Sequence, residues 1–213
     1  MLRKFSFFIC FLSLFCVSTL TAGKNYKSSM PLIVLDPGHG GNDHGAKVKT
    51  PFYVEEKRLA LKTCFLVRRY LEQMGYRVVM TRLSDVFVPL KERVYYANNR
   101  NCEIFVSIHF NSCSKKEVEG IEIYYCPDRK NGSPQARKLA YNVLHKSTQR
   151  THSKSRGVKV ANFCVIKETK MPSILIEGGF LTNSKELSKL RQSAYLNSLA
   201  KGVTEGIHNF FKQ

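Results

Sequence analysis

The 213-residue chain predicts a single α/β domain, a twisted and mostly parallel sheet of about six strands flanked by helices. Two observations predict this fold class. Short apolar runs of strand length alternate with longer segments in which apolar residues recur at helical spacing. The length also allows one well-buried core and is too short for two large domains. We expect that domain to occupy residues 31–213.

The N-terminus has the pattern of a secretory signal. Arg3 and Lys4 precede an apolar stretch of about 16 residues, which ends near the small residue Ala22. This pattern predicts a signal peptide over residues 1–22 and a short linker over residues 23–30. The alternative is an uncleaved anchor helix, because the stretch approaches the roughly 20 residues that span a bilayer. Cleavage would release the protein into the periplasm or the cell envelope.

The first half of the domain predicts three strands and two helices. An apolar run over residues 32–36 ends at a Pro-Gly pair and predicts a strand. Apolar residues at helical spacing predict a helix over 55–74, which a glycine terminates. A strand over 76–81, a polar loop, a helix over 90–100 and a strand over 104–108 complete this half.

The second half begins with a strand over residues 120–125, whose alternating side chains are typical of a sheet edge. The remaining expected elements are a helix over 133–150, a basic polar loop over 151–159, a short apolar run over 162–166, a strand over 173–178 and a helix over 193–211. No internal repeat or low-complexity tract interrupts this alternation.

Net charge and cysteine content indicate which binding partners and which disulfides to expect. The chain carries 34 basic and 16 acidic residues, a net charge of +18, which favours a polyanionic neighbour such as an acidic wall polymer or anionic lipid. No RNP, zinc-finger or helix-turn-helix signature is present, so we expect no nucleic-acid partner. Five cysteines follow the signal without CxxC spacing, and we expect buried thiols with at most two disulfides: Cys64, Cys102, Cys113, Cys126 and Cys164.

Ionisable residues follow the ends of three expected strands. His39 lies after the first strand, His109 ends the third, and Glu177 ends the last. Glu56 is placed on the sheet-facing stripe of the first helix, in its first turn. Ligands of open α/β sheets bind at the carboxyl ends of the strands. Each residue alone has an ordinary structural role, but two imidazoles, a carboxylate ligand and a second carboxylate together suit a catalytic zinc.

The turn around His39 is rich in glycine, which lets the backbone turn sharply and lets a substrate approach. A phosphate-binding turn is the main competing interpretation. The segment DPGHGGNDHG fits neither G-x-x-x-x-G-K-[ST] nor G-x-G-x-x-G, so a metal ligand is the better interpretation.

Six ordered blocks cover nearly all of the chain after the signal: IVLDPGHGGNDHGA, EK-x-x-x-L, TR-x-x-D, SIHFN, GIEIYY and PSILIEGGFLTN. In this order they resemble the zinc-dependent N-acetylmuramoyl-L-alanine amidases of bacterial cell-wall remodelling (amidase-3 type). The resemblance implies cleavage of the amide between N-acetylmuramic acid and the first L-Ala of the peptidoglycan stem peptide. It also implies one Zn²⁺ held by His39, Glu56 and His109, with Glu177 as the catalytic carboxylate. We expect the protein to be a monomer.

Some assignments near these blocks stay open. Glu55 could replace Glu56 as the ligand, although the helical stripe favours Glu56. His44 stands where the family motif has proline, and we expect a loop residue there rather than a further ligand. Asp36 and Asn111 are the nearest candidates by sequence for fixing the imidazoles.

Two residues are candidate substrate contacts, namely Asn111 and Arg82. Arg82 has a second interpretation, which is the more favoured one: with Asp85 and Arg93 it would brace the sheet edge through ion pairs.

The interval between SIHFN and SILIEGG is about 60 residues long, which leaves no room for the added helix that blocks the zinc in some family members. We therefore expect no such autoinhibition, and an activator protein remains unknown.

Ser112 and Lys115 fit the S-x-x-K of penicillin-binding serine enzymes, as do Ser198 and Lys201, but no K-T-G or S-D-N accompanies them. The alternatives are another zinc peptidase or deacetylase, an added serine carboxypeptidase activity, or a non-catalytic wall-binding module.

Overall fold

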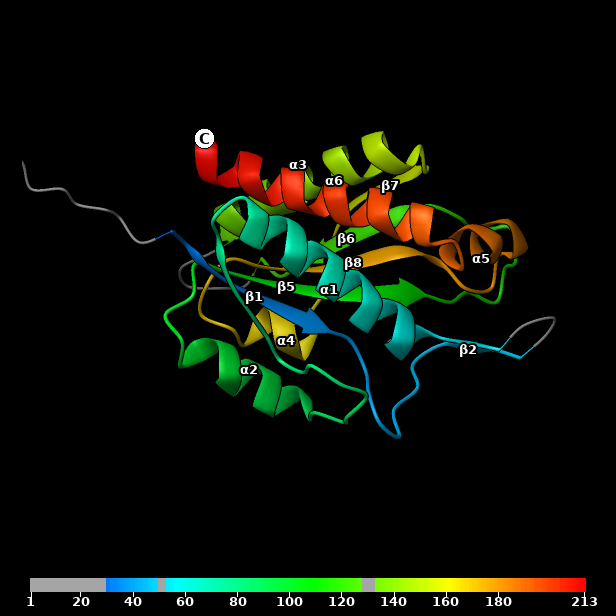
Figure 1. Cartoon of the computed structure of the whole chain (residues 1–213), viewed down its shortest axis with the longest axis horizontal. Helices are drawn as coiled ribbons and strands as arrows, with labels where there is room; N and C mark the ends of the chain where they lie inside the picture. The colour runs from blue at the N-terminus through cyan, green and yellow to red at the C-terminus, as the bar shows by residue number, and fades with distance from the viewer. Residues whose placement is uncertain (1–29, 50–52, 128–132) are drawn as a thin grey trace, which may run out of the picture.

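The computed structural model describes residues 30–49, 53–127 and 133–213. The expected signal peptide, and all of the expected linker except Met30, lie outside these residues. A six-stranded sheet in the order β4-β1-β5-β8-β6-β7 forms the centre of the domain (Figure 1). The strands are β1 (Leu32–Pro37), β4 (Arg77–Met80), β5 (Ile104–Asn111), β6 (Ile121–Tyr125), β7 (Ser155–Val160) and β8 (Ser173–Phe180).

All neighbouring strands of this sheet are parallel except β6 and β8, which pair antiparallel. The expected α/β class with a mostly parallel sheet is therefore confirmed. Because β1, β5 and β8 are central and parallel, their carboxyl ends lie together at one edge of the sheet, on the right in Figure 1. This edge is where the candidate site is built.

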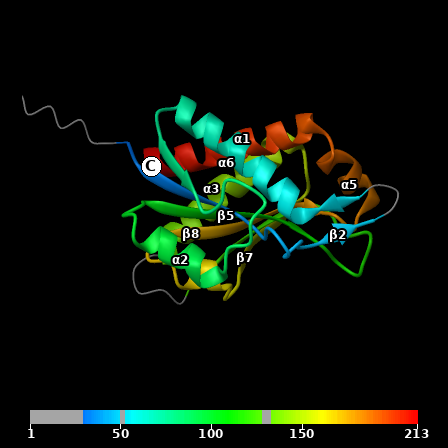
Figure 2. The ribbon, with the colours of Figure 1, turned by 60° about the horizontal axis from the view of Figure 1, so that its bottom comes forward.

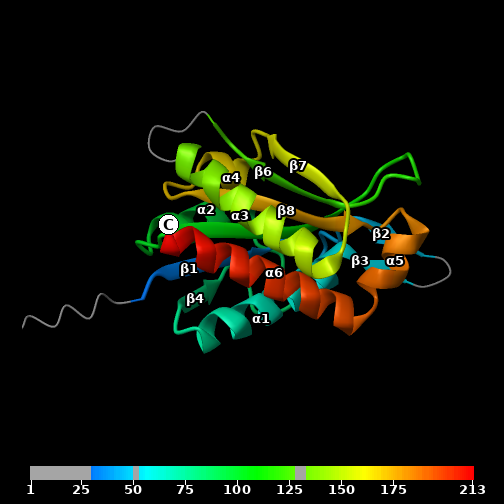
Figure 3. The same ribbon diagram turned by 90° about the horizontal axis from the view of Figure 1, so that it is seen from above.

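Helices cover both faces of the sheet, as Figures 2 and 3 show from two further sides. One face carries α1 (Glu56–Gln73), α3 (Ser133–Thr151) and α6 (Ser193–Lys212), and the other carries α2 (Leu90–Asn98) and the short α4 (Cys164–Lys167). The remaining elements are α5 (Ser184–Leu190) and the two-stranded ladder of β2 (Lys47–Val48) and β3 (Val54–Glu55).

The alternation along β1 explains the two layers. Ile33 and Leu35 belong to the core under α1, α3 and α6, whereas Leu32 and Val34 belong to the core under α2 and α4. All four are buried. A central parallel strand covered on both faces is therefore apolar on both sides, as the continuous run in the sequence indicated.

Two expectations about the second half of the sheet are wrong. Residues 155–159, expected as part of a loop, belong to the edge strand β7, so the strand expected over 120–125 is not at the edge. The reason is Glu122, which is 2% exposed and accepts hydrogen bonds from Arg156 and Lys159 of β7. A buried carboxylate therefore anchors a strand whose own sequence is basic and polar.

None of the helices in the described part of the chain is long and apolar enough to cross a membrane. All five cysteines after the expected signal are free thiols, with Cys64, Cys102 and Cys126 buried and Cys113 and Cys164 partly buried. The expectation of buried thiols is thus confirmed for three of them, and none of the five forms a disulfide.

Candidate metal centre

The turn after β1 holds His39 in an unusual backbone conformation. Its φ angle is 59°, in the left-handed region that costs a side-chain-bearing residue about 1–2 kcal/mol. Two backbone hydrogen bonds between Gly40 and Asp43 close the turn, and Arg93 Nη2 donates to the His39 carbonyl at 2.8 Å. Such local strain persists where surrounding contacts fix it, and it is frequent at functional sites.

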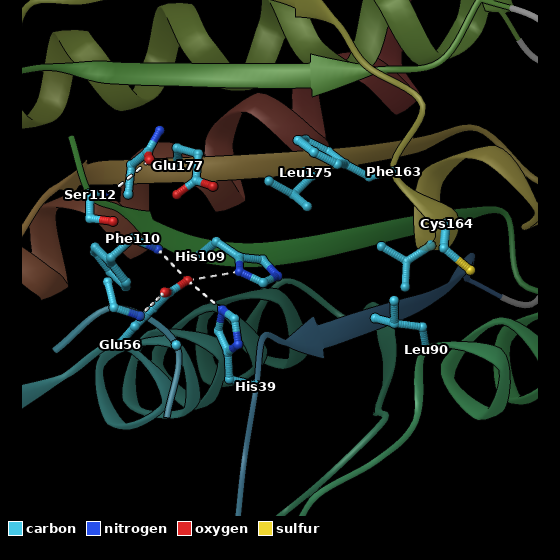
Figure 4. A pocket seen from close by; sticks show the side chains of 14 residues that line it. His39, Glu56, Leu90, His109, Phe110, Ser112, Phe163, Cys164, Leu175 and Glu177 are labelled. Atoms are coloured by element: carbon cyan, nitrogen blue, oxygen red, sulfur yellow. Dashed lines mark hydrogen bonds and ion pairs between the residues drawn. The ribbon is translucent and has the colours of Figure 1, made fainter. Parts of the chain in front are cut away.

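Three side chains from different elements converge at this turn (Figure 4). His39 Nε2 lies 2.9 Å from Glu56 Oε1, and His109 Nδ1 lies 2.8 Å from the same oxygen. The candidate ligand atoms of the three residues all lie within 4.8 Å of one another. The structure therefore brings together the three residues that the sequence analysis proposed as ligands.

Glu56 is placed by the backbone around it. Its Oε2 accepts from the Ala46 amide at 2.8 Å, and its Oε1 accepts from the Phe110 amide at 3.2 Å. Burial alone would raise the pKa of Glu56, but the hydrogen bonds from His109 and His39 lower it to about 2. A buried carboxylate that stays ionised between two imidazoles suits a divalent cation.

Two glycines leave the space that the side chains of the metal cluster occupy. A Cβ on Gly38 would lie 2.3 Å from His109 Cε1, and a Cβ on Gly45 would lie 2.5 Å from Glu56 Oε2. Gly45 also has a φ of +63°, which glycine adopts without strain. These glycines serve the close packing of the cluster as well as the turn.

Glu177 lies beside the cluster, opposite His109 in the register of β5 and β8. Its Oε2 is buried and has no hydrogen-bond partner. Burial, followed by the negative charges of Glu56 and Glu122, raises the pKa of Glu177 well above its ordinary value. A buried carboxyl oxygen without a hydrogen-bond partner destabilises the fold unless a ligand supplies the missing hydrogen bond. Carboxyl groups with such raised pKa values are frequent at functional sites.

The residue that orients His39 is Asp43. His39 Nδ1 lies 2.8 Å from Asp43 Oδ2, and Asp43 Oδ1 accepts from the Gly45 amide at 3.1 Å. Burial lowers the pKa of His39, but hydrogen bonds to Glu56 and Asp43 outweigh it, so the net direction is upward. Asp43 is not among the residues predicted from the sequence, although an acidic residue four positions after a histidine in a tight turn is a usable signal.

The expectation that Asp36 or Asn111 fixes the imidazoles is wrong. Asp36 is 1% exposed and binds Arg93, Thr81 and Ser107. The amide of Asn111 donates to Glu122 at 2.9 Å, and its oxygen accepts from the Ser112 amide. The carboxylate of Asp36 is thus taken up by Arg93, Thr81 and Ser107, and it forms no hydrogen bond with either histidine.

Arg82 is buried, and its guanidinium donates to the carbonyls of Pro37, Gly38, Lys57 and Ser84. It joins the loop after β1 to α1 and is 3% exposed, and its role as a substrate contact stays a prediction. Asp85 pairs with Lys57, and Arg93 pairs with Asp36. The bracing role expected for these residues agrees with these contacts, although Arg82 acts through carbonyls rather than through an ion pair.

The choice between neighbouring glutamates is clear from their contacts. Glu55 points away from the cluster and binds His44, Tyr53 and Arg58. His44 accordingly lies outside the group formed by His39, Glu56 and His109.

The two residues of the S-x-x-K match are exposed, and they lie in a segment without helix. Within the described residues, Ser112 and Lys115 form no hydrogen bond with each other. A serine nucleophile needs a base within hydrogen-bond reach. The contacts therefore do not favour a serine carboxypeptidase.

A pocket of about 370 Å³ opens over the cluster, and Figure 4 shows its lining. The side chains of His39 and His109 remain 22% and 17% exposed. The described helices therefore leave the cluster accessible, and α4 only borders the pocket through Cys164 and Val165. The lining residues are His39, Gly45, Ala46, Glu56, Leu90, His109, Phe110, Asn111, Ser112, Phe163, Cys164, Val165, Leu175 and Glu177.

Comparison with known proteins places this chain in one family. A family model described as N-acetylmuramoyl-L-alanine amidase matches residues 33–209. The amidase LytC of Bacillus subtilis is 34% identical over 180 residues, which are 84% of this chain and 35% of LytC. This chain thus spans about a third of the length of that relative.

Solved structures of the same family share this fold. The N-acetylmuramoyl-L-alanine amidase from Clostridium difficile 630 superimposes with a TM-score of 0.82 at 34% identity, covering 87% of this chain and 99% of that one. The CwlD amidase from Clostridioides difficile, solved in complex with the GerS lipoprotein, gives a TM-score of 0.80 at 28% identity, covering 85% and 98%. The chain described here belongs to the N-acetylmuramoyl-L-alanine amidase family.

Proposed function

We propose that the protein is a zinc-dependent hydrolase of peptidoglycan. It would cleave the amide between N-acetylmuramic acid and the L-Ala of the stem peptide. The observation that carries this proposal is the convergence of His39, Glu56 and His109 beside Glu177, whose Oε2 is buried and unpaired. Family membership supplies the substrate class.

The donor set fits zinc. Two imidazoles and a carboxylate are a common ligand combination for catalytic zinc, which keeps a further position open. Asp43 holds one imidazole from behind, as supporting carboxylates do in zinc sites. A bound zinc ion would supply Lewis-acid polarisation of the scissile carbonyl and of the attacking water.

The chain's own residues would do the remaining work. Glu177 takes a proton from the attacking water at a carboxylate oxygen and returns it to the amine that leaves with the stem peptide. The raised pKa of Glu177 suits a group that must both accept and release that proton. Apolar side chains, among them Leu90, Phe163 and Leu175, line much of the pocket around this exchange.

The setting is part of the proposal. The expected signal peptide would export the enzyme to the cell envelope, where peptidoglycan lies. CwlD has been solved with the GerS lipoprotein, and a protein partner is therefore part of the proposal for this chain. The open cluster supports activity of the isolated monomer without removal of a blocking helix. Purified protein that digests peptidoglycan only after a partner is added would contradict this part.

The test is digestion of purified sacculi with and without a chelator, followed by mass spectrometry of the fragments. The amidase predicts free stem peptides with N-terminal Ala, formed only when metal is present. Shortened peptides would identify a zinc peptidase, and released acetate would identify a deacetylase. A Glu177→Gln variant should keep its bound zinc but lose turnover, whereas His109→Ala should lose the zinc as well.

A further inference from the structure

A second groove, of about 450 Å³, lies at the same end of the molecule as the metal cluster. Its lining contains three lysines, Lys47, Lys49 and Lys116, and no acidic residue. None of these lysines forms an ion pair with any residue in the described ranges. The rest of the lining is Val48, Leu181, Thr182, Ser184 and Leu187.

The walls of this groove continue from the elements that hold the metal cluster. Ala46 bonds Glu56 through both its amide and its carbonyl, and Lys47 follows immediately. The segment after β8 is tied to the end of β5, because the Leu181 amide donates to the Asn111 carbonyl at 2.8 Å. All three ribbon views place β2 and α5 together at this end (Figures 1, 2 and 3).

These connections limit the distance between the two sites. Bond lengths from the Ala46 amide through an extended Lys47 side chain place its ammonium no more than about 14 Å from the Glu56 carboxylate. About four extended residues span that distance. A short peptide whose N-terminal amide lies at the metal cluster can therefore reach the lysines with its far end.

The opposite side of the cluster is apolar. Figure 4 shows Leu90 and Phe163 on one side of the two histidines and Ser112 on the other. Leu90 and Phe163 are 57% and 43% exposed, and Phe87 extends this surface at 56% exposure. The apolar surface and the basic groove thus lie on different sides of the cluster, in two hollows that share no lining residue.

The substrate of the proposed function has the same asymmetry. Its scissile amide joins an uncharged sugar acid to the N-terminus of a peptide, so a peptide that is not cross-linked carries a free carboxylate at its far end. We propose that Lys47 and Lys116 bind this carboxylate and that the apolar wall faces the sugar. This inference rests on the proposed amidase function and fixes the direction in which the substrate lies.

The expected contribution of the lysines is modest and measurable. Exposed ion pairs contribute little individually, so two lysines together should change kcat/KM by about threefold to tenfold. Because the carboxylate lies away from the reacting atoms, the change should fall on KM while kcat stays constant. Added salt should weaken the effect by screening.

The experiment uses soluble N-acetylmuramoyl peptides of two to four residues that end in either a carboxylate or a carboxamide. The wild-type enzyme should prefer the carboxylate by about threefold to tenfold in kcat/KM for the length that reaches the groove. The variant Lys47→Ala/Lys116→Ala should lose this preference, and Lys47→Arg/Lys116→Arg should retain it. The control Lys170→Ala/Lys212→Ala removes the same charge from two exposed lysines outside the groove and should change nothing.

The outcomes separate this inference from the proposed function. Hydrolysis of both peptides with no preference, or a preference that survives in Lys47→Ala/Lys116→Ala, would overturn the carboxylate site and leave the amidase intact. A loss of rate in that variant that is equal for both peptides would also overturn it, and would point to an anionic wall polymer instead. No hydrolysis of either peptide or of sacculi by the zinc-loaded wild type would refute the amidase itself.

Discussion

Removing Asp43 should weaken metal binding without unfolding the protein. In the variant Asp43→Ala, His39 loses the acceptor that lies 2.8 Å from its Nδ1. The ring would then be free to rotate or change tautomer, which reduces its readiness to present Nε2 to a cation. Asp43 also holds the Gly45 amide, so the turn itself would loosen.

The size of this effect follows from the exposure of the pair. Loss of such supporting carboxylates typically costs 10-fold to 100-fold in metal affinity, or about 1.4–2.7 kcal/mol. The Asp43 side chain is 44% exposed and water can partly replace it, so we expect the lower end, roughly tenfold. Asp43→Asn keeps an acceptor oxygen and should lose less than Asp43→Ala.

The assay is competition for zinc between the protein and a chromophoric chelator of known affinity. Thermal melting of the metal-free proteins serves as the control and should shift by less than about 3 °C, because an exposed side chain contributes little to stability. An unchanged zinc affinity in Asp43→Ala would refute the role assigned to this residue. Equal losses in zinc affinity and in metal-free stability would point to general damage of the turn.

Three further predictions concern the framework of the site. Gly38→Ala should fold but lose zinc and activity, because its Cβ would lie 2.3 Å from His109 Cε1; zinc content and far-UV circular dichroism measure this. Asp36→Ala should lower the free energy of unfolding by about 3–5 kcal/mol, because it leaves the buried guanidinium of Arg93 without its carboxylate. Lys91→Ala, which removes the exposed ion pair with Glu168, should lower it by less than about 1 kcal/mol. Equal melting temperatures for the two variants would contradict that reasoning. Burial alone would raise the pKa of Glu122, but hydrogen bonds from two cations and a tyrosine lower it. The ionised carboxylate therefore stabilises the fold at pH values above its unfolded pKa of about 4.3. This stabilisation is lost as the pH falls further. The melting-temperature deficit of Glu122→Gln should therefore be full at neutral pH and shrink in acid; a deficit independent of pH would refute the sign.

The meeting of the three candidate ligands could be predicted because parallel strands place their carboxyl ends at one edge. His39 follows β1, His109 lies near the end of the neighbouring strand β5, and the helical stripe carries Glu56 to the same place. These inferences need only periodicity and the general rule for open sheets. Side-chain direction within the site was harder to predict. Asp36 bonds Arg93, Thr81 and Ser107 instead of a histidine, and the left-handed turn at His39 brings Asp43 to its ring.

The edge of the sheet could not be predicted from local patterns. Residues 155–160 are basic and polar and carry a glycine, so their sequence favours a loop. Their strand depends on Glu122, which lies more than 30 residues earlier and is buried only because Arg156 and Lys159 neutralise it. A partner so distant in sequence leaves no periodic signal.

The central claim is that one zinc ion binds between the two imidazoles and the carboxylate. Diffraction data collected on either side of the zinc absorption edge, from crystals of freshly purified protein, test it most directly. We predict one anomalous peak, present only above the edge, enclosed by His39, Glu56 and His109. No peak there, or a peak at other residues while the protein still cleaves peptidoglycan, would contradict it.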